Sequence, residues 1–198
     1  MQYKKKEISE RILQAGRKEY VEKGYRGGNI STIAEQAGVP VGNLYRYYDG
    51  KMGLLTAIVR PAYTRIPKLI DELFNVADRD AGKSARLVTE RLLGIFDEYG
   101  EDILILADKC ASTRYEDFFD KLVEQCYNLT LGNLFEHPSE NDTFFCRMVV
   151  RSFMTSVFDV LRRGLDRADT EAMIERLLLF YFADIDKRIH ENREASDE

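Results

Sequence analysis

The side chains best suited to chemistry are those of Val41, Gly42 and Asn43, at the predicted start of a short helix. An asparagine amide can hydrogen-bond the edge of adenine, and a valine side chain can pack against the methyl group of thymine. Aromatic and basic residues follow, at positions expected mostly to hold the phosphate backbone: Tyr45, Arg46, Tyr47 and Lys51. The pattern predicts a helix that enters the major groove of double-stranded DNA.

A helix-turn-helix over about residues 29–48 would position these side chains. Apolar residues recur at helical spacing in its first helix: Ile30, Ile33, Ala34 and Ala37. Gly38 supplies the left-handed break between the two helices, and Leu44 is expected to face the interior. Asn29 is the expected cap of the first helix, where its side chain and the free amides behind it could hold a phosphate. Ser31 lies in the first turn of that helix.

This segment resembles the DNA-binding domain of the TetR (tetracycline-repressor) family, and the resemblance extends over about residues 7–60. The family pattern of I-A, A-G-V, G-x-L-Y-x-Y and a lysine is matched by Ile33-Ala34, Ala37-Gly38-Val39, the run from Gly42 to Tyr47, and Lys51. An upstream stripe that ends at Gly24-Tyr25 is similar to the supporting first helix of the family: Ile8, Ile12, Ala15, Gly16 and Tyr20. The chain departs from the pattern at three positions. Thr is frequent in the family at the position of Gly28, Ser or Thr at that of Pro40, and Lys at that of Val41.

The resemblance implies an all-α protein with two domains. Residues 1–50 would form a three-helix DNA-binding domain, and residues 51–198 a helical domain for effector binding and dimerisation. The implied function is that of a sequence-specific transcriptional regulator, a repressor that a small molecule releases from its operator. The small molecule would act by preferring the conformation that holds the two DNA-binding domains apart, and so would lower operator affinity.

The charge of the chain is unevenly distributed along its 198 residues. Through Lys68 there are 13 basic and 6 acidic residues, a net charge of +7, whereas the remainder carries 16 basic and 28 acidic residues, a net charge of −12. Charges more than about 10 Å apart are largely screened near physiological salt. A phosphate bound to the N-terminal part would therefore interact mainly with the basic residues there, so the overall net charge of −5 does not exclude DNA binding.

Other sequence features exclude several classes of protein. No apolar run approaches the roughly 20 residues that cross a bilayer, and no secretory signal is visible, so we expect a soluble cytoplasmic protein that does not contact membranes. The cysteines are odd in number and widely spaced, which predicts buried, reduced thiols: Cys110, Cys126 and Cys146. Only His137 and His190 could assist them, so we expect no metal site and no cofactor.

Helices are also predicted for the rest of the chain. A fourth helix should begin after Asp49, and Pro61 should end or kink it because proline cannot donate the helical hydrogen bond. Pro67 repeats the interruption. Further helices are expected over about residues 81–99, 102–109, 115–135, 142–164 and 170–191.

The last two predicted helices, residues 142–164 and 170–191, are apolar on more than one narrow stripe. This indicates one face against the core and a second against a partner subunit, although the central helices of a monomer could show the same composition. In the TetR family the last two helices form a four-helix dimer interface, so the resemblance implies a homodimer here. A twofold dimer would space two recognition helices about 34 to 36 Å apart, to match a palindromic operator.

Aromatic and apolar residues of the C-terminal part could line an effector pocket, although most such residues belong to ordinary cores. The candidates are Tyr99, Cys110, Tyr115, Phe119, Tyr127, Met148 and Phe158. Two other classes of protein remain as alternatives. An enzyme would need a convergent catalytic set, which is not visible. A helical protein-interaction module could keep the helix-turn-helix fold without binding DNA.

Overall fold

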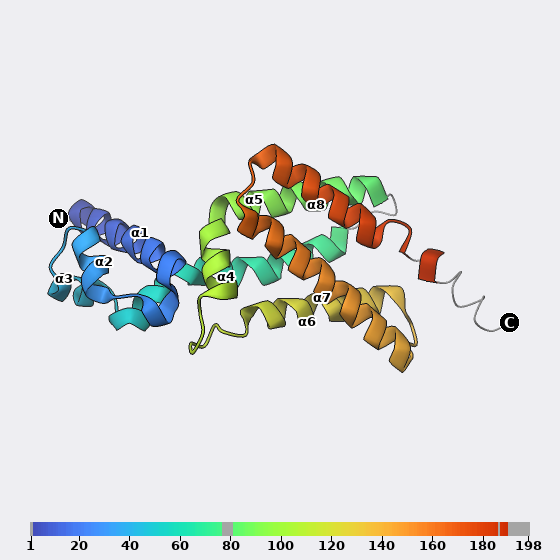
Figure 1. The fold of residues 1–198 in the computed structure, drawn as a ribbon, viewed down its shortest axis with the longest axis horizontal. Coiled ribbons are helices and arrows are strands. Elements are labelled where there is room, and N and C mark those ends of the chain that lie inside the picture. The colour runs from blue at the N-terminus through green and yellow to red at the C-terminus, as the bar shows by residue number, and fades with distance from the viewer. Residues whose placement is uncertain (1, 77–80, 186, 190–198) are drawn as a thin grey trace. The chain divides into compact units, whose positions relative to one another are not determined.

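The computed structural model describes residues 2–76, 81–185 and 187–189, and within these ranges all regular structure is helical (Figure 1). The predicted all-α class is therefore confirmed. In chain order the helices are α1 (Gln2–Gly27), α2 (Ile30–Gln36), α3 (Val41–Tyr47), α4 (Gly50–Val76), α5 (Ala81–Asp108), α6 (Phe118–Leu134), α7 (Glu140–Arg163) and α8 (Arg167–Phe182).

The chain divides into two compact units. The N-terminal unit comprises the residues up to Ile66 together with Tyr99–Phe119, and the C-terminal unit comprises Pro67–Glu98 and the residues from Asp120 onward. The helix-turn-helix therefore packs with the first half of α4 and with the end of α5. The functional boundary expected near residue 50 stays a prediction.

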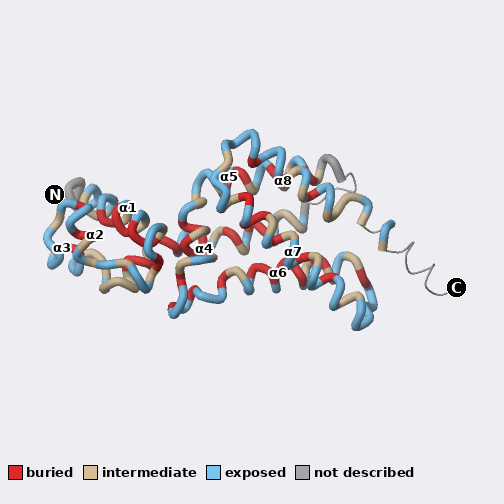
Figure 2. Tube along the Cα trace, in the orientation of Figure 1, coloured by how far each residue is buried: buried red, intermediate tan, exposed pale blue. Residues whose placement is uncertain are grey.

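The core of the N-terminal unit is built from one face of α1 and the first half of α4. Figure 2 shows buried positions recurring along α1 between exposed ones, and Ile12 and Tyr20 are among the fully buried residues. Gly16 lies at a close contact between the two helices, because a β-carbon at this position would stand 2.9 Å from Cδ2 of Leu54. The glycine in the upstream stripe therefore allows α1 to pack directly on α4.

The core of the C-terminal unit joins α5, α7 and α8. Its buried residues are Ala85, Val157, Val160, Ile174 and Leu178, with Phe96, Phe153 and Phe182 packed against them. Both long C-terminal helices are capped by side chains. Ser139 and Asp142 form a capping box at the start of α7, and the Asp166 side chain accepts from the Asp169 N–H in α8. These local signals fix where the two helices begin.

Several predicted helix boundaries are wrong. Neither Pro61 nor Pro67 ends α4, although a proline inside a helix costs about 3 kcal/mol. Buried side chains on both sides of the prolines keep the helix intact through packing: Ile58, Val59, Ala62, Ile66 and Leu69. The segments predicted as 81–99 and 102–109 form the single helix α5, which continues through Gly100.

The final helix is also displaced from its predicted range of 170–191. It begins at Arg167, because Asp166 supplies the cap, and it ends at Phe182. Ala183 is extended and Asp184 has a left-handed backbone (φ +52°), which breaks the helix. Residues 186, 190 and 191 of the predicted range lie outside the described residues.

Candidate nucleic-acid interface

The first helix of the motif begins with the side-chain cap that the sequence predicts. Asn29 has an extended backbone (φ −125°, ψ 123°), and its side chain accepts a hydrogen bond of 2.8 Å from the Ser31 N–H. Both residues are exposed to solvent. Both backbone N–H groups are paired within the protein, that of Ser31 with Asn29 Oδ1 and that of Asn29 with Oε1 of Glu19 (3.1 Å), so neither is free to donate to a phosphate oxygen.

The turn between α2 and α3 has the predicted geometry. Gly38 is left-handed (φ +64°), and the Val39 N–H donates to the Ala34 carbonyl over 3.0 Å. A residue with a side chain would be strained at this φ, so the glycine is required for the reversal of direction. The buried Ile33, Ala34 and Ala37 hold α2 against the rest of the unit.

Helix α3 presents one face to solvent and one to the core. Leu44 is fully buried, whereas Val41, Gly42, Tyr45 and Arg46 are exposed, with 56% of Tyr45 accessible. Their i, i+4 spacing places Val41 beside Tyr45 and Gly42 beside Arg46 on the outer surface. Leu44 therefore faces the core, as the sequence predicts, and these four residues of the predicted contact set are accessible to solvent.

Two predicted contact residues of α3, Asn43 and Tyr47, are only half-buried. Within the described part of the chain, the Asn43 amide has no hydrogen-bond partner, so its donors and acceptor remain available. The ring of Tyr47 lies beside that of Tyr48, with centroids 6.5 Å apart. The Tyr48 hydroxyl is hydrogen-bonded to Ser9 Oγ (2.6 Å), and burial raises the pKa of this phenol.

Lys51, the last predicted contact residue, is engaged with the end of α1. Its ammonium donates to the Arg26 carbonyl (3.1 Å) and lies 4.8 Å from the centre of the Tyr25 ring. Burial lowers the pKa of this ammonium. An ammonium has three donors, so a phosphate can still be bound by the other two. Lys51 therefore has a structural role that its position in the motif did not reveal.

Glu19 is a further residue of the interface region that the sequence reasoning missed. Its side chain is completely buried, and Oε1 accepts from the Asn29 backbone N–H (3.1 Å) and from Lys23 Nζ (3.0 Å). The carboxylate thus fixes the residue that caps α2. The sequence does contain a signal for this role, because Glu19 is a charged residue directly beside Tyr20 in a helical stripe that is otherwise apolar.

The end of α1 is fixed by residues distant in sequence. Helical geometry breaks at Gly24, as predicted, and the next N–H, of Tyr25, donates to the Lys109 carbonyl (2.8 Å). Further up α1, Arg17 makes a bidentate pair with the buried Asp102 of α5 (2.6 and 3.1 Å). These hydrogen bonds to Asp102 raise the pKa of the Arg17 guanidinium. The helix supporting the motif is therefore anchored at two points.

Residues 12–58, which contain this anchored helix-turn-helix, match the family of bacterial regulatory proteins known as the tetR family. The chain is a TetR-family transcriptional regulator. It is a DNA-binding protein and not an enzyme.

Individual relatives of this TetR-family regulator cover most of its length. It is 23% identical over 188 residues, 91% of this chain and 83% of the relative, to the transcriptional repressor KstR of Mycobacterium tuberculosis. Its fold is similar to that of FadR from Bacillus subtilis, solved in complex with stearoyl-CoA, with a TM-score of 0.58 at 17% identity and coverage of 88% and 98% of the two chains. A TetR-like regulator from Rhodococcus sp. RHA1 gives a TM-score of 0.59 at 18% identity, with coverage of 86% of this chain and 93% of the Rhodococcus chain.

The predicted effector-pocket residues of this TetR-family regulator are divided between the two units. Tyr99, Cys110, Tyr115 and Phe119 belong to the N-terminal unit, and Tyr127, Met148 and Phe158 to the C-terminal unit. Most are buried or half-buried, but Met148 is 47% exposed on α7. Their assignment to an effector stays a prediction.

The thiols of the regulator are buried, as predicted. Cys110, Cys126 and Cys146 are all free, and burial raises the pKa of Cys110 to about 11 and that of Cys126 to about 12. Among the described residues, no three potential ligands are grouped as a metal would require, and no helix has the length and apolar character to cross a membrane.

Proposed function

We propose that this TetR-family regulator is a homodimeric repressor that reads a palindromic operator with α3 and is released by a small molecule. The main support for operator recognition is the outer surface of α3. It combines an unpartnered Asn43 amide with exposed Val41, Tyr45 and Arg46, on a part of the chain that is net positive. Asn29, Ser31, Tyr47 and Lys51 complete the proposed contact set.

In this proposal the contact residues of α3 and of the start of α4 have two kinds of task. Val41, Gly42 and Asn43 contact base edges, because the first turn of a recognition helix enters the groove. Arg46 and Lys51 neutralise phosphates and contribute affinity regardless of sequence. Among the described residues Arg46 has no salt-bridge partner, so a phosphate does not have to displace one. The surface at Gly42 is open, since a β-carbon there would meet nothing within 4 Å.

The dimeric part of the proposal is supported by apolar side chains exposed on adjacent helices of the C-terminal unit. They are Phe144, Phe145 and Met148 of α7, and Met173, Leu179 and Phe180 of α8, with 75% of Phe180 accessible. Exposed apolar groups of this size are unfavourable in water and are typical of a contact surface. A second copy of the same two helices would cover them in a twofold arrangement.

The effector part is supported by the relatives. KstR is a repressor, and FadR of Bacillus subtilis was solved with stearoyl-CoA. We therefore choose stearoyl-CoA as the first molecule to test against the operator complex, with stearate and coenzyme A separately as controls. Release by the intact thioester alone would identify an acyl-CoA effector.

DNA binding by single-residue variants tests the proposed contacts. We expect Asn43→Ala to lose about 1–3 kcal/mol of discrimination at one base position of each half-site. Arg46→Ala should weaken binding to all duplexes and reduce the slope of log affinity against log salt by about 0.9 for each phosphate that is no longer neutralised. Fluorescence anisotropy with a selected duplex and with a scrambled duplex measures both effects.

Two further variants complete this test. Lys51→Ala should resemble Arg46→Ala, but it needs a parallel unfolding measurement, because Lys51 also holds Arg26. Arg91→Ala removes an exposed charge of the C-terminal unit and should leave affinity unchanged. Wild-type affinity in both Asn43→Ala and Arg46→Ala would reject the contact assignment, and absence of any binding to DNA would favour the protein-interaction module.

A further inference from the structure

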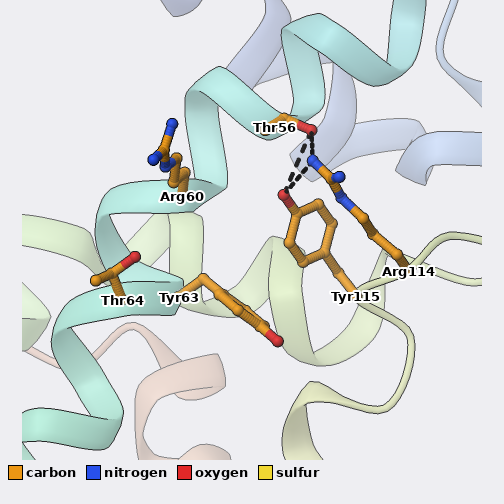
Figure 3. A pocket seen from close by; sticks show the side chains of 6 residues that line it. All are labelled: Thr56, Arg60, Tyr63, Thr64, Arg114 and Tyr115. Carbon is orange, nitrogen blue, oxygen red and sulfur yellow. Dashed lines mark hydrogen bonds between the residues drawn. The ribbon is translucent and has the colours of Figure 1, made fainter.

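A pocket of about 500 Å³ lies in the N-terminal unit between α4 and the segment that follows α5 (Figure 3). Thr56, Arg60, Tyr63 and Thr64 line it from α4, and Arg114 and Tyr115 line it from the other side. The four α4 residues are spaced i, i+4, i+7 and i+8, so they share one face of the helix. The pocket combines two guanidinium groups, two phenol rings and two threonine hydroxyls, and no carboxylate lines it.

The Arg114 guanidinium is held in place without a negative partner. Its Nη2 donates to Thr56 Oγ1 (2.9 Å) and to the Tyr115 hydroxyl (3.1 Å), which itself donates to Thr56 Oγ1 (3.3 Å). Figure 3 shows this side chain reaching across to α4. Within the described ranges neither Arg114 nor Arg60 forms a salt bridge. The two positive charges that line the pocket are therefore not neutralised by the protein.

The aromatic side of the pocket has a fixed geometry. Tyr115 is buried, and its ring packs edge-on against that of Tyr63, with centroids 5.1 Å apart. Tyr63 also packs against the buried ring of Phe118, at 5.6 Å. The Tyr63 and Tyr115 rings thus form an apolar wall, and the Arg114 guanidinium lies 5.1 Å from the centre of the Tyr115 ring.

We propose that this pocket binds a small phosphorylated molecule, with its phosphoryl group at Arg60 and Arg114 and its organic part against Tyr63. Guanidinium groups bind phosphate oxygens through paired, charge-assisted hydrogen bonds. Arg114 is already positioned by two hydroxyls, so it loses little conformational entropy when a ligand arrives. The aromatic wall distinguishes an organic phosphate from the free ion.

The segment that carries Arg114 also contacts the end of α1. The Lys109 carbonyl accepts from the Tyr25 N–H, and Ser112 Oγ accepts from Arg26 Nε (3.1 Å). The Arg26 carbonyl in turn accepts from Lys51. A ligand bound to Arg114 restrains the segment that contacts the end of α1, next to the proposed DNA contacts, so that its binding and DNA binding are linked. This consequence, unlike the site itself, depends on the proposed function.

Isothermal titration calorimetry of the full chain at constant ionic strength tests the site without DNA. The probes are phenyl phosphate, inorganic phosphate and phenol. We expect phenyl phosphate to bind more tightly than inorganic phosphate, and phenol not to bind. Arg60→Ala and Arg114→Ala should each weaken phenyl phosphate at least about tenfold, the loss expected for one charge-assisted contact. Arg91→Ala, which removes an exposed charge elsewhere, is the matched control and should match wild type.

Three results would overturn the proposed site. They are no binding of phenyl phosphate to wild type, an equal loss in Arg91→Ala, or affinities for phenyl phosphate and inorganic phosphate that do not differ. Circular dichroism of each variant establishes that it is folded. If Arg60 and Arg114 instead held DNA phosphates, both variants would lose DNA affinity while their affinity for phenyl phosphate stayed unchanged, which also contradicts the proposal.

A second titration tests the link to DNA. We expect saturating phenyl phosphate to change the operator affinity of wild type but not that of Arg114→Ala. An equal change in both proteins would refute the link. Failure of all DNA binding would refute the proposed function, while the calorimetric result would still decide whether the pocket is an organic-phosphate site.

Discussion

Removal of the Glu19 carboxylate should weaken both the fold and DNA binding, because this buried group holds the residue that begins α2. Glu19→Ala leaves the Asn29 N–H without its acceptor, which costs about 1–3 kcal/mol. Loss of the packing of its completely buried side chain adds about 1 kcal/mol. We therefore expect a total loss of about 2–4 kcal/mol in the free energy of unfolding.

Glu19→Gln separates the hydrogen bond from the charge. A glutamine oxygen can still accept from Asn29, but the ion pair with Lys23 is removed, so we expect a smaller cost of about 1 kcal/mol. Glu22→Ala, which removes an exposed glutamate from the same helix, is the matched control. Urea unfolding followed by circular dichroism measures stability, and anisotropy with a selected duplex measures DNA affinity.

The order of the three variants decides the interpretation. We expect Glu19→Ala to be the least stable, Glu19→Gln intermediate, and Glu22→Ala close to wild type, with operator affinities in the same order. A Glu19→Ala protein within about 0.5 kcal/mol of wild type, the range of ordinary surface substitutions, would refute the reasoning.

The proposed dimer surface and the thiols give two further predictions. Phe180→Asp should weaken the free energy of dimerisation by about 2 kcal/mol per copy, which sedimentation equilibrium would show as a shift toward monomer. Asn128→Asp, at an exposed site on α6, is the control and should cause no shift. An unchanged dimer in Phe180→Asp would place the interface elsewhere. A pKa of about 11 instead of 9.0 favours the neutral thiol, so near pH 8 Cys110 should have about a hundredfold less thiolate and react correspondingly slowly with iodoacetamide. Mass spectrometry showing labelling as fast as in unfolded chain would contradict this.

The helix-turn-helix was predictable because its determinants are local. Asn29 caps the helix that begins one residue later, and Gly38 reverses the chain where the α2 pattern stops. Leu44 and the exposed positions around it follow from helical periodicity alone. Each of these features depends on neighbours a few residues away, so the sequence contains the necessary information.

The misplaced boundaries have a different physical cause. Local propensity predicts that Pro61 and Pro67 end or kink the helix, but α4 continues through both, because burial of the flanking side chains outweighs the hydrogen bonds that the prolines cannot make. Gly100 likewise continues α5, whose next residues Asp102 and Ile103 are buried. Tertiary packing decides these cases, and it cannot be read from a single segment.

The missed residues of the site depend on contacts between distant parts of the chain. Arg17 pairs with Asp102, 85 positions away, and Arg114 reaches Thr56 across 58 positions. The motif predicts a phosphate contact for Lys51, and the structure adds a hydrogen bond to the Arg26 carbonyl. No periodicity or motif relates such pairs, so the second binding site that we propose became visible only in three dimensions.

Selection of bound sequences from random duplexes by the purified wild-type protein, repeated with Asn43→Ala, tests the central claim most directly. The claim is that α3 of each subunit of a twofold dimer reads one half of an operator. It predicts an enriched palindrome whose half-sites are about one helical turn or a multiple apart, with preference relaxed at one symmetric pair of positions in Asn43→Ala. Enrichment of no sequence, or of an identical palindrome by both proteins, would contradict it.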